Sequence, residues 1–214
     1  MAPIAPGRKL AETIHLTAAG LWLGTLVMTG ATAAVMFGTS RELGPMLPEF
    51  AAYDGSHADL LAGAIQNQVF KLSDIIQFAC ATLCLASMIA LIAFLKLPVR
   101  TISTAVRLCS LGLALGIFSY YLMILTPRMQ TNLKQYYDAA RLGQLETAAE
   151  ARARFDADHP TASNSLIGTT IAVLLVLGGG AWSATSAGTI RELEPGTRRG
   201  GSLEEPKLAR GGAR

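Results

Sequence analysis

The chain has 214 residues, of which 51% are hydrophobic and only 15% are charged. A soluble domain carries about 25% charged residues, so this composition argues against an ordinary water-soluble globular protein. The 18 basic and 15 acidic side chains leave a net charge of +3, and no basic patch interleaves with aromatic residues. We therefore expect no nucleic-acid partner.

Four runs of apolar residues are each long enough to cross a bilayer. A hydrocarbon core of about 30 Å needs roughly 20 residues of helix at 1.5 Å per residue. The four runs contain no Asp, Glu, Lys or Arg, and they cover residues 14–37, 75–95, 108–126 and 166–188. The first run is too long for the core of a cleaved signal peptide. We expect all four runs to be membrane spans.

The predicted fold class is all-α, a four-helix transmembrane bundle with helical extensions outside the membrane. Residues 11–190 form the four-span membrane domain, and residues 1–10 form an N-terminal segment. The tail, residues 191–214, is rich in Gly, Pro, Glu and Arg and has no aromatic residue. Such a segment cannot bury enough apolar surface to offset its ordering entropy, so we expect it to be disordered.

The connections between the spans carry helix signals of their own. Ser56 and Asp59 form a capping-box pattern, which predicts a helix that begins near His57 and continues into the second span. The segment 127–163 is rich in Ala, Glu, Gln and Arg, which favour helix. We expect water-exposed helices there that extend the third and fourth spans. Pro160 should start or kink the last helix, because it has no backbone donor.

Basic residues near the span ends favour one orientation. The turn expected at residues 98–107 and its flank carry Lys96, Arg100 and Arg107 without any acidic residue. The start of the chain and the tail are also basic, and in a four-span protein they lie on the same side as this turn. Basic residues concentrate in cytoplasmic loops. We therefore expect a multi-pass protein of the plasma (inner) membrane with both termini in the cytoplasm.

Small residues recur at helical spacing inside the spans. Gly20 and Gly24 stand four apart in the first span, Gly112 and Gly116 do so in the third, and the fourth contains 178–180 as three glycines. Small residues let membrane helices approach closely. We expect these stripes to be contacts within the bundle, but the same pattern also fits a homo-oligomer.

Polar side chains inside the spans are the candidate functional residues. At 100° per residue, His15 and Trp22 share one face of the first span. One interpretation is that such residues line a path for a small molecule or ion, because polar groups in a membrane are costly and often functional. The other is that hydroxyls bond to their own helix while His15 and Trp22 anchor at the interface. The candidates are His15, Trp22, Thr25, Thr29, Gln77 and Asn164.

A metal or haem site is a secondary possibility. Cys80 and Cys84 stand four apart on one helical face, and thiolates suit copper(I). No Cys-x-x-Cys or His-x-x-x-His pattern accompanies them, so we expect no metal and no cofactor. His15 and His159 lie on opposite sides of the membrane in the expected topology, which does not suit two axial ligands of one haem. We find no residue set placed for catalysis, and expect no enzyme activity.

The segment 14–24, in which His15 is followed by Trp22-Leu23-Gly24, resembles the opening of the transmembrane-protein-205-like family. The likeness covers about residues 11–187 and differs in Pro160, which directly follows the histidine. Further matching positions are Gly63, Phe70, Pro127, Phe155, His159, Ser163 and Asn164. The resemblance implies a four-span membrane protein with no established reaction. The opening is also similar to copper-resistance D-type membrane proteins, which implies a copper-linked role.

Three functions stay open on these observations. The first is a membrane protein that handles a small molecule or ion through a polar helix interface, with the lipid bilayer and a second copy of the chain as partners. The second is a structural membrane protein that binds an unknown protein partner through residues 127–163. The third is a copper- or haem-linked membrane protein.

Overall fold

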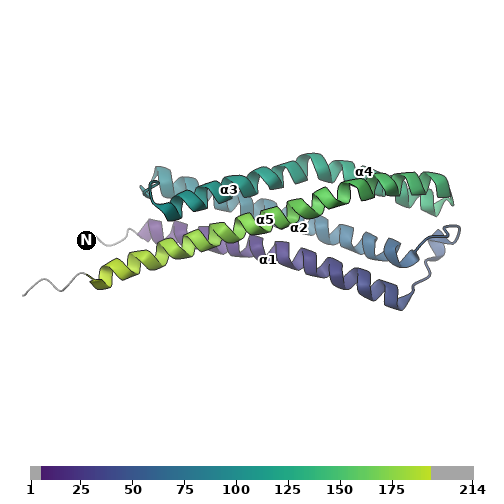
Figure 1. Cartoon of the computed structure of the whole chain (residues 1–214), viewed down its shortest axis with the longest axis horizontal. Coiled ribbons are helices and arrows are strands. Elements are labelled where there is room, and N and C mark those ends of the chain that lie inside the picture. Colours follow the sequence, from purple (N-terminus) through teal and green to yellow (C-terminus); the bar gives the residue numbers. More distant parts are fainter. Residues whose placement is uncertain (1–5, 194–214) are drawn as a thin grey trace, which may run out of the picture.

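The computed structural model describes the backbone of residues 6–193 and the side chains of residues 6–183. Within that part of the chain the helices are α1 (Pro6–Leu43), α2 (His57–Ala93), α3 (Ile102–Tyr120), α4 (Thr126–Arg141) and α5 (Leu145–Leu193). A short 3-10 helix, η1, covers Pro48–Phe50, and a π-helical segment, η2, covers Tyr121–Leu125. The described residues contain no strand. The predicted all-α bundle is confirmed (Figure 1).

Among the described residues, four helical rods are long and apolar enough to cross a membrane. They cover Pro6–Leu43, His57–Ala93, Ile102–Arg141 and Leu145–Ser183. The third rod joins α3, η2 and α4 end to end. These are the features of a multi-pass membrane protein, as predicted. The rods are longer than the predicted spans because the helices continue into the connections.

The predicted outer boundaries differ slightly from the helices. α1 begins at Pro6, inside the segment 1–10 that the sequence placed before the membrane domain. α5 continues to Leu193, so residues 191–193 are helical and not part of a disordered tail. The rest of the tail prediction concerns residues 194–214, which lie outside the described residues.

The four rods pack with α1 along α2, with α3 and α4 along α5, and with α1 also against α5. The first turn of α1 and the last turn of α5 lie at the same end of the bundle (Figure 1). The α1–α2 connection and the α4–α5 turn lie at the other end (Figure 1). We name these the terminal end and the connection end.

Local capping fixes where the helices start and stop. The Ser56 hydroxyl accepts a hydrogen bond from the Asp59 backbone N–H at 3.1 Å, and α2 runs unbroken from His57. This confirms both the predicted cap and the predicted continuous helix. α1 ends just before Gly44, which has a φ of 54°, a left-handed conformation that glycine adopts without steric cost.

Pro160 and Pro127 have different effects on the helices that contain them. Pro160 lies inside α5, so the prediction that it starts the last helix is wrong. Packing of α5 on both sides of Pro160 outweighs the one lost backbone hydrogen bond. Pro127 is the second residue of α4, two residues after the end of η2, where the Thr126 N–H donates to the Tyr121 carbonyl. Because Pro127 cannot donate to the Met123 carbonyl, the helix widens at this point.

The segment 127–163 is helical, as predicted, and it packs against its own chain. α4 and the first part of α5 enclose an apolar cluster with α2 and η1. Its buried members are Phe50, Leu60, Tyr136, Ala139, Ala140, Ala148 and Ala151. A second cluster fills the middle of the bundle, where the Trp22 and Phe118 rings meet edge to face at 5.8 Å.

Most glycines of the predicted stripes do not contact another helix of the bundle. A Cβ added at Gly20, Gly24, Gly112 or Gly116 would meet no atom within 4 Å. Large side chains such as Trp22 fill the interface instead, so these faces point outward. The prediction of intramolecular contact is wrong for these four glycines and holds in the fourth span, at 179–180. The homo-oligomer stays a prediction.

Candidate functional site

A chain of polar side chains joins α1 to α2 in the middle of the bundle. The Trp22 indole N–H donates to Gln77 Oε1 at 3.2 Å, and Gln77 Nε2 donates to Ser73 Oγ at 3.1 Å. The Thr29 hydroxyl donates to Ser73 Oγ at 2.8 Å. Three predicted residues, Trp22, Thr29 and Gln77, therefore come together. Their side chains hydrogen-bond to one another and so join the two helices.

Replacing Gln77 with leucine should lower the free energy of unfolding by about 0.6–1.7 kcal/mol, the range measured for hydrogen bonds between membrane helices. The reason is that the Trp22 indole loses its acceptor in a buried position. The measurement is unfolding in mixed detergent micelles followed by circular dichroism. Gln68→Leu, at an exposed position of α2, is the matched control. Equal losses in both variants would contradict the interhelical role.

The other predicted polar residues do not join this chain. His15 is fully buried, and its Nδ1 lies 3.1 Å from both the Cys84 carbonyl and Ser87 Oγ. It therefore attaches α1 to α2 and is not an interfacial anchor. Thr25 donates to the Leu21 carbonyl of its own helix. Asn164 is exposed on α5.

An ion pair that the sequence did not predict lies near the terminal end. The Arg107 side chain is 0% exposed, and it holds the Glu12 carboxylate with two hydrogen bonds of 3.3 and 2.9 Å. The sequence placed Arg107 in a turn at 98–107, but α3 begins at Ile102. Arg107 is therefore a helix residue that ties α3 to α1, and not a loop charge that sets orientation.

The cysteines and histidines of the described chain lie in separate parts of the fold. Cys80 and Cys84 are buried on α2, and the Cys84 thiol lies 3.8 Å from the His15 carbonyl. No three His, Cys, Asp or Glu side chains of residues 6–183 are grouped to hold a metal. His15 contacts the second half of α2, whereas His159 lines a cavity near the connection end.

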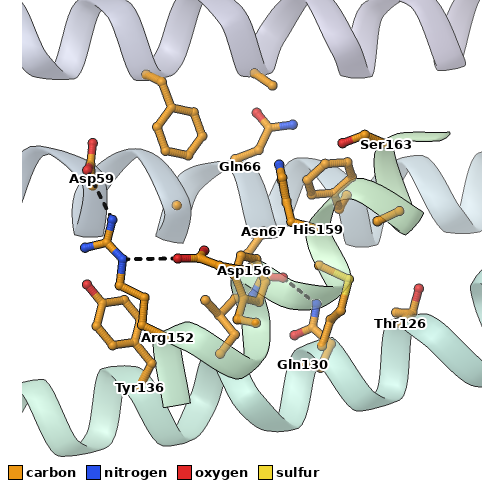
Figure 2. A pocket seen from close by; sticks show the side chains of 18 of the residues that line it. Asp59, Gln66, Asn67, Thr126, Gln130, Tyr136, Arg152, Asp156, His159 and Ser163 are labelled. Carbon is orange, nitrogen blue, oxygen red and sulfur yellow. Dashed lines mark hydrogen bonds and ion pairs between the residues drawn. The ribbon is translucent and has the colours of Figure 1, made fainter. Parts of the chain in front are cut away.

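That cavity is the candidate functional site (Figure 2). It has a volume of about 530 Å³ and lies between α1, α2, the η2–α4 segment and α5. Pockets of about 300–1,000 Å³ are typical for drug-sized ligands. Its apolar wall consists of Ala33, Ala34, Phe37, Gly63, Phe70, Met129, Leu133, Phe155, Ala162 and Leu166.

The charged side chains at the outer part of the cavity form ion pairs with one another. Asp59 accepts from Arg41 at 3.0 Å and lies 3.8 Å from Arg152. Arg152 of α5 thereby bridges to α2, and it also lies 3.6 Å from Asp156 of its own helix (Figure 2). Gln130 of α4 donates to Asn67 of α2 beside this group (Figure 2). These contacts tie the cavity walls together and leave little net charge at the rim.

The inner part of the cavity holds polar atoms without partners. Gln66 Oε1, Asp74 Oδ1 and Thr126 Oγ1 are buried and have no hydrogen bond in the structure. All three residues line the cavity, together with Tyr121 of the π-helical segment, which interacts with Asp74. Buried polar groups are normally paired. Unpaired atoms gathered at one cavity indicate a place where a ligand's polar groups bind.

Gly63 and Tyr137 shape the wall outside the predicted spans. The Tyr137 hydroxyl donates to the Leu60 carbonyl at 2.9 Å. A Cβ added at Gly63 would lie 2.7 Å from that hydroxyl, so glycine makes room for the bond.

The residues that carry the family resemblance divide between the cavity and the lipid face. Gly63, Phe70 and His159 line the cavity. Pro127 stands beside the π-helical segment that brings Tyr121 into the lining. Gly24 has open space around it.

The sequence did not lead us to predict the face of α2 that lines the cavity. Asp59, Gly63, Gln66, Phe70 and Asp74 line the cavity at spacings that keep one helical face. The signal was present, because a helix from His57 into the second span was predicted. Extending the helical-face analysis back from Gln77 would have found these residues.

No family model, no curated protein and no solved structure matches this chain. The likeness to the transmembrane-protein-205-like family therefore stays a prediction from sequence. Function has to be argued from the geometry of the cavity and from the four apolar helices.

Proposed function

We propose that this chain is a multi-pass membrane protein that binds a small amphipathic molecule in the cavity near the connection end. The observation that supports the proposal is the combination of an apolar wall with buried, unpartnered polar atoms in a space of about 530 Å³. The apolar wall suits an apolar body, and the unpartnered oxygen atoms suit polar groups that fix its orientation. Its action is binding or carriage, and we propose no catalytic role.

The cavity, and not the α1–α2 interface, is the ligand site in this proposal. The polar side chains between α1 and α2 use their hydrogen bonds on one another, so a ligand gains nothing there. The first hypothesis from the sequence is thus kept, with its site moved toward the connection end. Asp59, Gln66, Asn67, Asp74 and Gln130 replace the stripe residues as the polar lining.

The predicted orientation gives the cavity a side of the membrane. Basic residues predict cytoplasmic termini. The cavity lining includes Asp59, near the first residue of α2 at the connection end, and the connection end lies opposite the terminal end (Figure 1). With this orientation the cavity opens toward the outer leaflet or the space beyond it. The proposed ligand would enter from that side.

A cavity-filling substitution tests the proposal. Ala162 lines the cavity on α5, and Ala157 is exposed on the same helix outside the lining. Three probes share one apolar body: 4-phenylbutanol, 4-phenylbutylamine and 4-phenylbutyrate. We expect the protein in lipid nanodiscs to bind at least one of them by isothermal titration calorimetry. Ala162→Phe should weaken that binding about tenfold or more, because the ring occupies the space.

Ala157→Phe is the matched control and should bind as the unmodified chain does. Empty nanodiscs give the heat of partition into lipid, which is subtracted. Absence of saturable binding by all three probes would overturn the proposal. Equal binding by the two phenylalanine variants would overturn it as well.

The other two hypotheses gain no specific support. The apolar side of α4 packs into a cluster of its own chain. Burial of this side of residues 127–163 therefore requires no protein partner. A partner for their exposed side stays a prediction, tested by co-purification with and without Gln130–Arg154. A copper- or haem-linked role also stays a prediction, tested by metal analysis and an absorption spectrum.

A further inference from the structure

Asp74 is the one carboxylate of the cavity that lies at its buried inner part. Asp74 is 9% exposed, and its Oδ1 has no hydrogen-bond partner. No ion pair of the described residues includes it. The two arginines of the lining, Arg41 and Arg152, are paired with Asp59 at the rim.

No element packed around the inner part offers Asp74 a cation. α1 contributes small and aromatic side chains such as Ala33 and Phe37, and η2 contributes the Tyr121 phenol. α4 and α5 contribute uncharged residues there, among them Thr126 and Leu166. On α2 itself the nearest basic residue, Lys71, is exposed and outside the lining. A buried carboxylate without a cation is costly, so a cationic group bound beside Asp74 would be favoured by its charge.

A second unpartnered acceptor lies on the same face of α2. Gln66 is 3% exposed, its Nε2 donates to the Thr29 carbonyl, and its Oε1 is free. Gln66 and Asp74 are separated by two helical turns, roughly 12 Å at 1.5 Å per residue. Phe70 lies between them on the lining. Both free atoms accept hydrogen bonds, so the matching ligand groups must donate.

From this geometry we infer that the ligand is an amphipathic amine, whose ammonium group pairs with Asp74 while its apolar body lies along Phe70. The inference rests on the proposed function, because it specifies what the cavity binds. An ammonium group supplies both the missing charge and hydrogen-bond donors. The rings of Phe70 and Tyr121 add a favourable surface for a cation. A carboxylate or phosphate at this end would meet the like charge of Asp74, with only the Tyr121 and Thr126 hydroxyls as donors nearby.

The three phenylbutyl probes test the inference through their relative affinities. In nanodiscs near neutral pH, the unmodified chain should bind 4-phenylbutylamine about tenfold more tightly than 4-phenylbutanol, and 4-phenylbutyrate least. Asp74→Asn removes the charge and keeps the shape, so the amine-to-alcohol affinity ratio should fall toward about one. Asp74→Glu keeps the charge and should retain a preference for the amine. Asp138→Asn, at an exposed site outside the cavity, should leave the ratio unchanged.

The unmodified chain decides the inference even where the asparagine variant does not fold. Cavity binding without preference for the amine would overturn the ammonium assignment and leave the proposed function intact. If the unmodified chain binds none of the three probes more tightly than Ala162→Phe does, the ammonium assignment and the proposed function are both overturned. An amine preference that persists in a folded Asp74→Asn variant would overturn the role of Asp74.

Discussion

Replacing Glu12 with glutamine should destabilise the folded protein by about 3–5 kcal/mol, the loss typical when one partner of a buried ion pair is removed. Arg107 is 0% exposed, and both of its terminal nitrogens bond to Glu12. An arginine stays charged under all physiological conditions. Without the carboxylate, the guanidinium would keep its charge in a site that excludes solvent.

The measurement is the free energy of unfolding in mixed detergent micelles. Glu42→Gln, at an exposed position near the end of α1, is the matched control and should change it by less than about 0.5 kcal/mol. The double variant Glu12→Gln with Arg107→Met should recover much of the loss, because no unpaired charge remains. A double variant that is no more stable than Glu12→Gln would show that the pair itself, and not the stranded charge, sets the loss.

The ion pair between Arg107 and Glu12 could not be predicted from the sequence. The spans were located as stretches without charge, so the third span was drawn from residue 108 and Arg107 fell into the turn before it. Its partner, Glu12, is 95 residues away, and only the packing of α1 against the other helices brings the two together. A charge compensated at such a distance in sequence has no local pattern.

The four helices, by contrast, follow from local chemistry. Long charge-free runs predicted the rods, and Ser56 predicted the start of α2. Pro160 lies inside α5 although proline disfavours helix interiors, because the contacts along a long helix compensate for one missing backbone donor. Local preference decides the ends of helices well and their interiors poorly.

The site was predictable only in part, because a cavity is a property of several helices at once. The sequence predicted one shared face for His15 and Trp22, and the structure links Trp22 to Thr29 through Gln77 and Ser73. The sequence did not show that this group fills its own interface. The cavity instead needs α4 and the first part of α5 to close over α2. No single-helix pattern contains that information.

A leucine at Gly179 should be poorly tolerated, whereas a leucine at Gly178 should be nearly neutral. A Cβ at Gly179 would lie 2.8 Å from Arg107 Cγ and 3.1 Å from the Ser103 backbone carbonyl. The backbone atom cannot move aside without shifting α3, and overpacking of this kind costs about 1–3 kcal/mol or more. A Cβ at Gly178 would meet nothing within 4 Å, so its side chain would face lipid.

The same unfolding measurement compares Gly179→Leu with Gly178→Leu, and equal stabilities would refute the close approach of α5 to α3. The loss at Gly179 should also overlap with the loss at Glu12, because displacing Arg107 breaks the contact that Glu12→Gln removes. Residues that share a partner give non-additive losses. The variant carrying both Glu12→Gln and Gly179→Leu should therefore lose less stability than the sum of the two. A glycine on α5 and a glutamate on α1 thus act on stability through one buried arginine.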